Sequence, residues 1–62
     1  MNLNKTNNLK LLLVEDDSML SGALKSYMES QGVTFRAEAR GDRAVDRVRE
    51  FLPDAVILDC LL

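Results

Sequence analysis

Apolar positions follow two kinds of pattern along the chain, and together they predict three strands. Residues 9–14 and 55–58 are almost entirely apolar, which is typical of short strands that are covered on both faces of a sheet. Residues 33–39 alternate between apolar and polar side chains. That alternation predicts a strand with one solvated face, at the edge of a sheet.

Two segments with apolar residues at helical spacing lie between the predicted strands. Residues 18–31 form the first, and the side chain of Asp17 or Ser18 can cap its first turn. Gly32 is typical of the residue that ends a helix, and residues 42–52 repeat the helical period. The residues of the first helix that we expect to pack into the core are apolar ones: Met19, Leu20, Ala23, Leu24, Tyr27 and Met28.

The alternation of strands and helices predicts an α/β fold of β-α-β-α-β order. Such a chain forms a parallel sheet with crossover helices, and the expected strand order is 2-1-3. An all-apolar strand such as 55–58 normally lies inside a sheet. With one side unpaired, it would expose an edge at which a second copy can pair. The sequence is therefore interpreted as half of a larger α/β domain.

Carboxylates follow both apolar strands directly. Glu15 and Asp16 come after the first strand, and Asp59 comes after the last. Sites in open α/β sheets form beyond the carboxyl ends of the strands, where the strand order switches direction. The three side chains should therefore meet in one crevice, although Asp16 and Asp59 lie 43 positions apart in the sequence. Taken alone, Asp59 could equally be a turn residue at the end of a strand.

A cluster of carboxylates favours a particular chemistry. Carboxylate oxygens suit Mg²⁺, which would offset the repulsion between them. The ion would also shield an incoming phosphoryl group, so that one carboxylate could act as a nucleophile and form an acyl phosphate. The sequence thus predicts a magnesium site next to a nucleophilic aspartate.

Composition excludes several classes of protein. The 62 residues suffice for one small domain, and the net charge of −2 gives no overall attraction to nucleic acid or to an anionic membrane. The single cysteine, Cys60, allows no intrachain disulfide and is read as inert packing. There is no histidine, so a mechanism that uses an imidazole must take it from a partner.

The N-terminal residues and the apolar runs bear on where the protein resides, and the arginine-rich stretch bears on what it binds. Residues 1–8 are polar, lack the apolar core of a signal peptide and are expected to be a disordered tail. No apolar run approaches the ~20 residues of a membrane helix. A single cysteine fits a reducing cytosol, so we expect a cytoplasmic protein. Acidic residues interleave with the arginines between positions 36 and 50, which is typical of a solvated surface rather than a nucleic-acid patch.

The motifs together resemble the response-regulator receiver domain of two-component signalling, a flavodoxin-like (CheY-like) three-layer fold. The resemblance rests on residues 12–17, the amphipathic pattern over 14–52 and the stretch 54–62. The Glu-Asp acidic pair and residues 39–44 look most like the OmpR-type transcription regulators. We therefore interpret residues 9–62 as the N-terminal half of a receiver domain.

This resemblance implies a role for each acidic residue of the crevice. Asp59 would be the phosphoacceptor, and Asp16 would bind Mg²⁺ directly. Glu15 would bind the ion largely through water, and the backbone carbonyl of Leu61 would complete the protein ligands. Asp17 matches a variable position of the family and is interpreted as a helix cap.

The resemblance also implies partners. A sensor histidine kinase would supply the phosphoryl group, and a DNA-binding domain beyond residue 62 would regulate transcription in the full-length parent. No DNA-reading element is present in these residues. The family's later strands and helices have no counterpart here, nor do its hydroxyl residue, its phosphoryl-binding lysine and its switch aromatic.

Two alternatives to a phosphorylatable, non-enzymatic receiver stay open. The first is an enzyme, such as an aspartate-nucleophile phosphatase or an acidic-triad nuclease. Those chemistries usually use a second acid two residues after the strand-end aspartate, where this chain has Leu61. The second is a truncated, non-phosphorylatable half-domain that acts only through self-association at the edge of strand 55–58.

Overall fold

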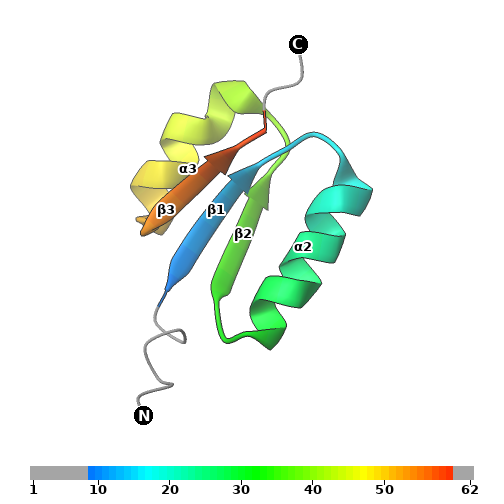
Figure 1. Ribbon diagram of the computed structural model, residues 1–62. Coiled ribbons are helices and arrows are strands. Elements are labelled where there is room, and N and C mark those ends of the chain that lie inside the picture. Colours follow the sequence, from blue (N-terminus) through cyan, green and yellow to red (C-terminus); the bar gives the residue numbers. More distant parts are fainter. Residues whose placement is uncertain (1–8, 60–62) are drawn as a thin grey trace.

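Three parallel strands in the order β2-β1-β3 form the sheet of the computed structural model, which describes residues 9–59 (Figure 1). The expected strand order is thereby confirmed, as is the α/β class. The elements follow one another as β1 (Lys10–Val14), α2 (Ser18–Ser30), β2 (Thr34–Glu38), the 3₁₀ turn η1 (Gly41–Arg43), α3 (Ala44–Phe51) and β3 (Ala55–Leu58). The tail predicted at residues 1–8 lies outside the described residues.

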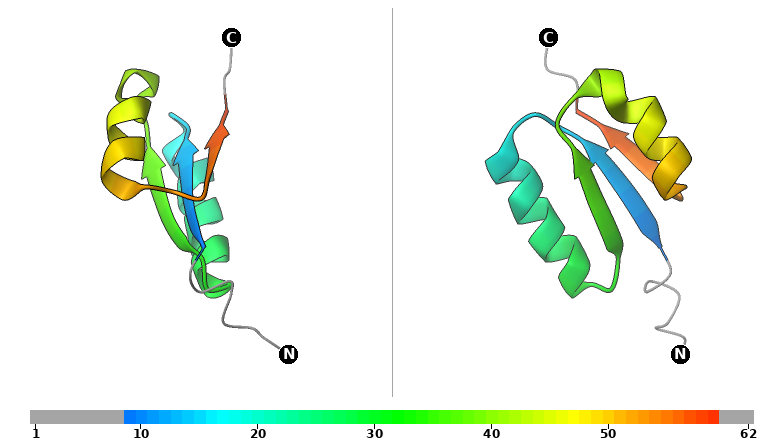
Figure 2. Two further views of the ribbon diagram at one scale, coloured as in Figure 1. Left: turned by 90° about the vertical axis from the view of Figure 1, so that its left-hand side faces the viewer. Right: turned by 180° about the vertical axis from the view of Figure 1, so that it is seen from behind.

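The central strand β1 is covered on both faces, because the two helices lie on opposite sides of the sheet (Figure 2). Successive side chains of a strand point to opposite faces, so the four apolar residues of β1 serve two separate clusters. Leu11 and Leu13 pack on the α2 side with Val33, Phe35, Leu24 and Met28. Leu12 and Val14 pack on the α3 side with Phe51, Ala44 and Val48.

Local hydrogen bonds explain where α2 begins and ends. The carboxylate of Asp17 accepts hydrogen bonds from the backbone N–H groups of Met19 at 3.0 Å and Leu20 at 3.1 Å, which confirms its predicted role as a cap. The last turn closes at Gly32, whose positive φ of 86° favours glycine. Helix α2 itself ends at Ser30, one residue before the expected position.

The helix predicted over 42–52 is divided in the structure. Residues Gly41–Arg43 form a 3₁₀ turn, and α3 spans only Ala44–Phe51. The η1 turn, which has no side-chain cap among the described residues, leads from the end of β2 into α3. At its other end α3 closes on Leu52, which adopts a left-handed φ of 54°.

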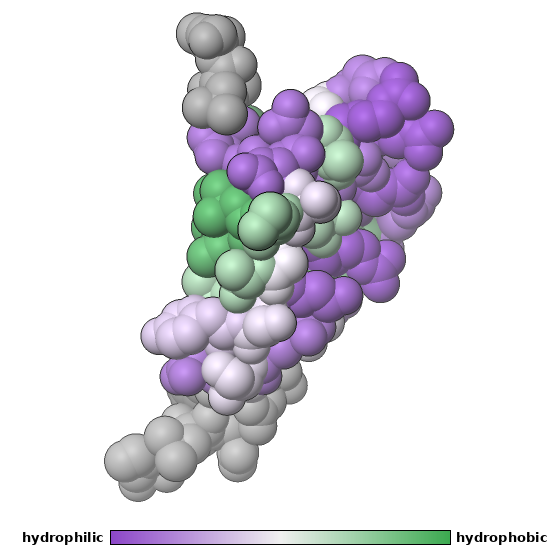
Figure 3. All heavy atoms as spheres, turned by 90° about the vertical axis from the view of Figure 1, so that its right-hand side faces the viewer, coloured by the Kyte–Doolittle hydropathy of each residue, from purple (hydrophilic) through white to green (hydrophobic). Residues whose placement is uncertain are grey.

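The prediction that the whole apolar face of α2 is core was wrong. Met19 is 84% exposed and Tyr27 is 60% exposed, whereas only Leu24 and Met28 pack against the buried cluster. The reason is the position of α2, which lies along β2 at the edge of the sheet (Figure 1). Only a narrow stripe of the helix therefore reaches a strand. The remaining surface of α2 faces solvent on the side of the molecule that Figure 3 shows.

Strand β3 occupies the other edge and keeps its apolar side chains exposed. Val56 is 40% exposed, Ile57 43% and Leu58 63%. Among the described strands β3 pairs only with β1, on one side.

No helix within residues 9–59 is long and apolar enough to cross a lipid bilayer.

Candidate functional site

The backbones of Glu15 and Asp59 continue the hydrogen bonding of the sheet just beyond the ends of β1 and β3. The backbone N–H of Asp59 donates to the carbonyl oxygen of Val14 at 3.1 Å. On the other side of β1, the N–H of Glu15 donates to the carbonyl oxygen of Glu38 at 2.9 Å. The sheet therefore fixes the backbone of both residues and brings Asp59 next to the end of β1.

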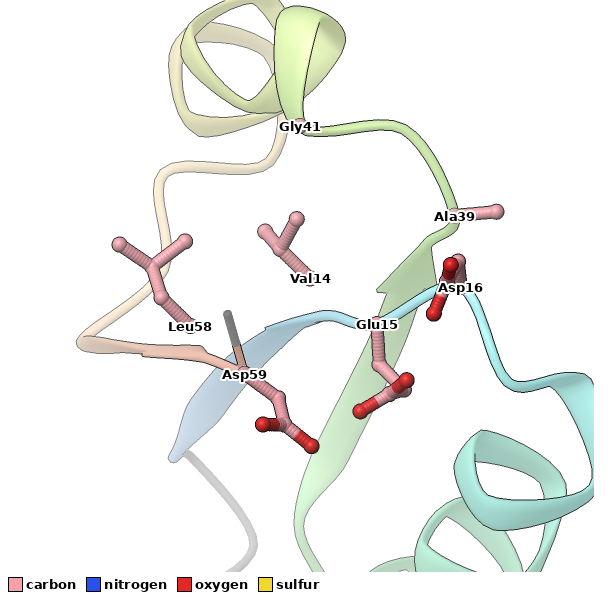
Figure 4. Close-up of a pocket in the computed structure, with 7 residues that line it drawn as sticks. All are labelled: Val14, Glu15, Asp16, Ala39, Gly41, Leu58 and Asp59. Carbon is pink, nitrogen blue, oxygen red and sulfur yellow. The ribbon is translucent and has the colours of Figure 1, made fainter. Parts of the chain in front are cut away.

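A pocket of about 230 Å³ opens at this edge of the sheet (Figure 4). It is lined by the three acidic residues that the sequence singled out and by small or apolar ones: Val14, Glu15, Asp16, Ala39, Gly41, Leu58 and Asp59. The carboxylates of Glu15 and Asp59 point toward one another, whereas the side chain of Asp16 lies on the other side of Glu15, near Ala39. All three predicted acidic residues thus share one pocket, but only two of them face each other.

Glu15 is the most constrained of these carboxylates. It is 3% exposed, and its Oε2 atom accepts a hydrogen bond from the backbone N–H of Asp17 at 2.9 Å. Its Oε1 atom is buried and has no hydrogen-bond partner within residues 9–59. An unpaired buried oxygen of this kind is unfavourable and marks a position where a ligand or ion can bind.

The neighbouring acid changes the protonation of Glu15. Its pKa is raised above the ordinary value, chiefly because a proton on Glu15 can be shared with the facing carboxylate of Asp59. The Asp17 N–H acts in the opposite direction, and burial raises the pKa further. Glu15 therefore keeps its proton to a higher pH than an isolated glutamate does.

The oxygen atoms of the pocket are of the kind that a hard cation binds, but the three acidic side chains are not arranged around one ion position. Carboxylate oxygens are the ligands that Mg²⁺ prefers, and the Oε1 atom of Glu15, unpaired within the described part of the chain, lies beside a second carboxylate. No group of three or more His, Cys, Asp or Glu side chains in the described part of the chain is close enough together to hold a metal ion. Joint binding of one ion by Glu15, Asp16 and Asp59 stays a prediction. Leu61, the fourth predicted ligand, lies outside the described residues, as does Cys60.

Sequence reasoning missed Glu38, which stands next to the pocket. Its Oε2 atom accepts a hydrogen bond from the backbone N–H of Arg40 at 2.8 Å, and its Oε1 atom accepts one from Nε of Arg47 at 2.9 Å. These two donors, the Arg40 N–H first, lower the pKa of Glu38. The interleaved charges predicted a solvated surface, but the side chain of Glu38 is only 12% exposed.

Comparison with known proteins supports the motif analysis. The chain is 42% identical over 53 residues to the phosphate regulon transcriptional regulatory protein PhoB of Rhizobium meliloti (strain 1021). The match covers 86% of this chain but 23% of that relative, so the chain spans about a quarter of the relative's length. No family model matches the chain, and no solved structure matches it. The similarity confirms the resemblance to OmpR-type response regulators.

Proposed function

We propose that this chain, a relative of the OmpR-type response regulators, is the phosphoaccepting part of a receiver domain and that Asp59 accepts the phosphoryl group. The observation that carries the proposal is the pairing of Asp59 with Glu15. Asp59 is exposed at the end of β3, where a donor can reach it, and its carboxylate faces the buried Glu15, one oxygen of which is unpaired among residues 9–59. A strand-terminal turn residue would need no such neighbour.

The proposed chemistry is phosphoryl transfer from nitrogen to oxygen. A carboxylate oxygen of Asp59 attacks the phosphorus of a phosphohistidine, the P–N bond breaks as the O–P bond forms, and the product is an acyl phosphate. The imidazole leaves with the electrons of the P–N bond and takes up a proton. Because this chain contains no histidine, a separate sensor histidine kinase would supply the donor.

We propose Glu15, Asp16, Asp59 and the backbone carbonyl of Leu61 as the residues that would hold Mg²⁺. When bound, the ion supplies positive charge that offsets the repulsion among the carboxylates and the phosphoryl group. Glu15 would keep its backbone in place through the bond from its N–H to Glu38. The role of Asp16 requires its side chain to turn toward the pair, since it now lies on the other side of Glu15.

The relative suggests what the phosphorylation controls. PhoB of Rhizobium meliloti is by name a transcriptional regulatory protein. We propose that a longer, cytoplasmic parent of this chain regulates transcription through a DNA-binding domain outside these residues. The chain would then be a signalling module and not an enzyme, so we expect one phosphoryl group per molecule and no multiple turnover of phosphate esters with Mg²⁺.

Phosphorylation by acetyl phosphate with Mg²⁺ tests the proposal. Intact-mass spectrometry should show the addition of one phosphoryl group to the wild type and none to Asp59→Asn. A matched control is Asp42→Asn, which removes an exposed carboxylate outside the pocket lining and should leave phosphorylation unchanged. Modification that survives in Asp59→Asn would overturn the assignment of the phosphoacceptor.

The self-association alternative depends on the exposed apolar edge of β3. Ala55, Val56, Ile57 and Leu58 are all exposed, and an unpaired strand edge is a template for pairing with another chain. This alternative needs no phosphoryl transfer, so it predicts dimers that form equally with and without acetyl phosphate. Sedimentation velocity that finds a folded monomer would contradict it.

A further inference from the structure

A charged pair beside the acidic pocket connects β2 to α3. Glu38 is the last residue of β2, and Arg47 lies in the middle of α3. Nε of Arg47 donates to Oε1 of Glu38 at 2.9 Å, and Nη1 of Arg47 forms a second ion pair with Glu50. The side chains of Glu38 and Arg47 are only 12% and 26% exposed, so water screens this pair far less than an ordinary surface pair.

The same carboxylate also holds the loop that forms one wall of the pocket. Oε2 of Glu38 accepts the backbone N–H of Arg40 at 2.8 Å. The residues on either side of Arg40, Ala39 and Gly41, both line the pocket. Because each oxygen of Glu38 has a different partner, the side chain fastens the loop to α3 and leaves neither oxygen free.

A third bond from the same residue reaches the acidic pair. The backbone carbonyl oxygen of Glu38 accepts the N–H of Glu15 at 2.9 Å. One residue therefore contacts both the pocket wall and the backbone of the buried carboxylate. A shift of the Ala39–Gly41 loop would change the position of Glu38 and so disturb Glu15.

We propose that Glu38 and Arg47 are positioning residues for the acidic pocket. They hold the loop 39–41 at a fixed distance from Glu15 and Asp59, and so preset the space that an incoming phosphoryl group must enter. The inference rests on the function proposed for the pocket. Neither side chain lines the pocket, so both act through the loop and through the backbone of Glu15.

Kinetics of phosphorylation test this role. We expect Glu38→Gln and Arg47→Gln to lower the second-order rate constant for acetyl phosphate with Mg²⁺ on the order of tenfold, because small misplacement of reacting groups is costly. Arg47→Lys keeps the positive charge and should recover part of that loss. The matched control, Asp42→Asn, removes the ion pair between Arg40 of the loop and Asp42 of η1, whose side chains are 60% and 65% exposed, and should leave the rate unchanged.

A purely structural role for the pair predicts a different result. The rate would then fall only in proportion to the unfolded fraction, which the free energy of unfolding of each variant gives directly. A Glu38→Gln protein that is fully folded and phosphorylated at the wild-type rate would overturn the inference. A folded Glu38→Gln protein with the expected loss of rate would support it.

Amide hydrogen exchange separates failure of this inference from failure of the proposed function. If even the wild type takes up no phosphoryl group, the proposed function is overturned, but the exchange of the Arg40 and Glu15 N–H groups can still be measured. Faster exchange at these two positions in Glu38→Gln, with Leu12 N–H unchanged, supports positioning. Equal exchange in Glu38→Gln and Asp42→Asn overturns it.

Discussion

The backbone N–H of Asp59 donates a hydrogen bond to the carbonyl oxygen of Val14 at 3.1 Å, so the pairing of Asp59 with the end of β1 needs no side chain. Substitution of the side chain can therefore change the charge at position 59 while the backbone keeps its place. Asp59→Asn is nearly equal in size to the native residue. The variant thus isolates the electrostatic effect of the Asp59 carboxylate on Glu15.

Asp59→Asn should lower the pKa of Glu15. The largest cause of the raised pKa is the sharing of a proton on Glu15 with the facing carboxylate of Asp59, and the neutral amide removes the charge that favours this proton. A ¹³C NMR titration of the Glu15 carboxyl carbon measures the shift directly. An unchanged Glu15 pKa in the variant would contradict the facing arrangement of the two carboxylates.

The same variant should change how stability depends on pH. The folded-state pKa of Glu15 is raised, so its protonated form contributes to the stability of the folded protein. This stabilisation is fully present below the unfolded-state pKa and is lost as pH rises through the folded-state pKa. We therefore expect wild-type stability to fall relative to Asp59→Asn as pH rises from about 4, the ordinary glutamate range, towards neutrality. Urea unfolding at a series of pH values measures this difference, and parallel pH curves would argue against it.

Glu38 should give a pH dependence of the opposite sign. Its pKa is lowered, first by the Arg40 N–H and then by Arg47, so it contributes stability above the unfolded-state pKa. That contribution is lost as pH falls through the folded-state pKa. The stability difference between the wild type and Glu38→Gln should therefore shrink below about pH 4. Asp42→Asn is the control, since its exposed ion pair contributes little, and a difference that grows in acid would contradict the prediction.

The sheet and its acidic edge could be predicted because they depend on patterns that the chain displays locally. The apolar residues of β1 require cover on both faces, and alternating strands and helices require parallel pairing. Parallel strands then bring Glu15 and Asp59 to the same edge of the sheet. These steps use only the type and order of residues, so the prediction of a shared pocket for them was confirmed.

The remaining features depend on which neighbour each residue meets. Helical spacing marks Tyr27 as a residue that can be buried, but α2 lies at the sheet edge and leaves it exposed. The burial of Glu38 depends on its register opposite Val14 and on the approach of Arg47 from α3. Nor does the sequence indicate the direction of the Asp16 side chain, which lies on the far side of Glu15.

Removal of the α2 cap should destabilise the protein without affecting the pocket. Asp17→Ala deletes the carboxylate that accepts the N–H groups of Met19 and Leu20, and loss of such a cap costs about 1 kcal/mol. Chemical denaturation measures the loss. Asp17→Asn keeps an oxygen acceptor and should retain most of the stability. Equal stability of Asp17→Ala and the wild type would argue against the cap.

Leu52→Gly should stabilise the protein. Leu52 has a left-handed φ of 54°, which costs a residue with a Cβ atom roughly 1–2 kcal/mol, whereas glycine adopts this conformation freely. Its side chain is 69% exposed, so little buried contact is lost, although glycine increases the entropy of the unfolded chain by an equivalent of about 0.4–1 kcal/mol.

The net gain expected for Leu52→Gly is therefore about 0.5–1 kcal/mol in the free energy of unfolding. Leu52→Ala is the matched control, because it shortens the side chain but keeps the Cβ atom and the unfavourable φ. The bond from the N–H of Leu52 to the carbonyl of Val48, at 2.8 Å, is available in both variants. Urea unfolding that finds the glycine variant no more stable than the alanine variant would show that the left-handed end of α3 carries no strain.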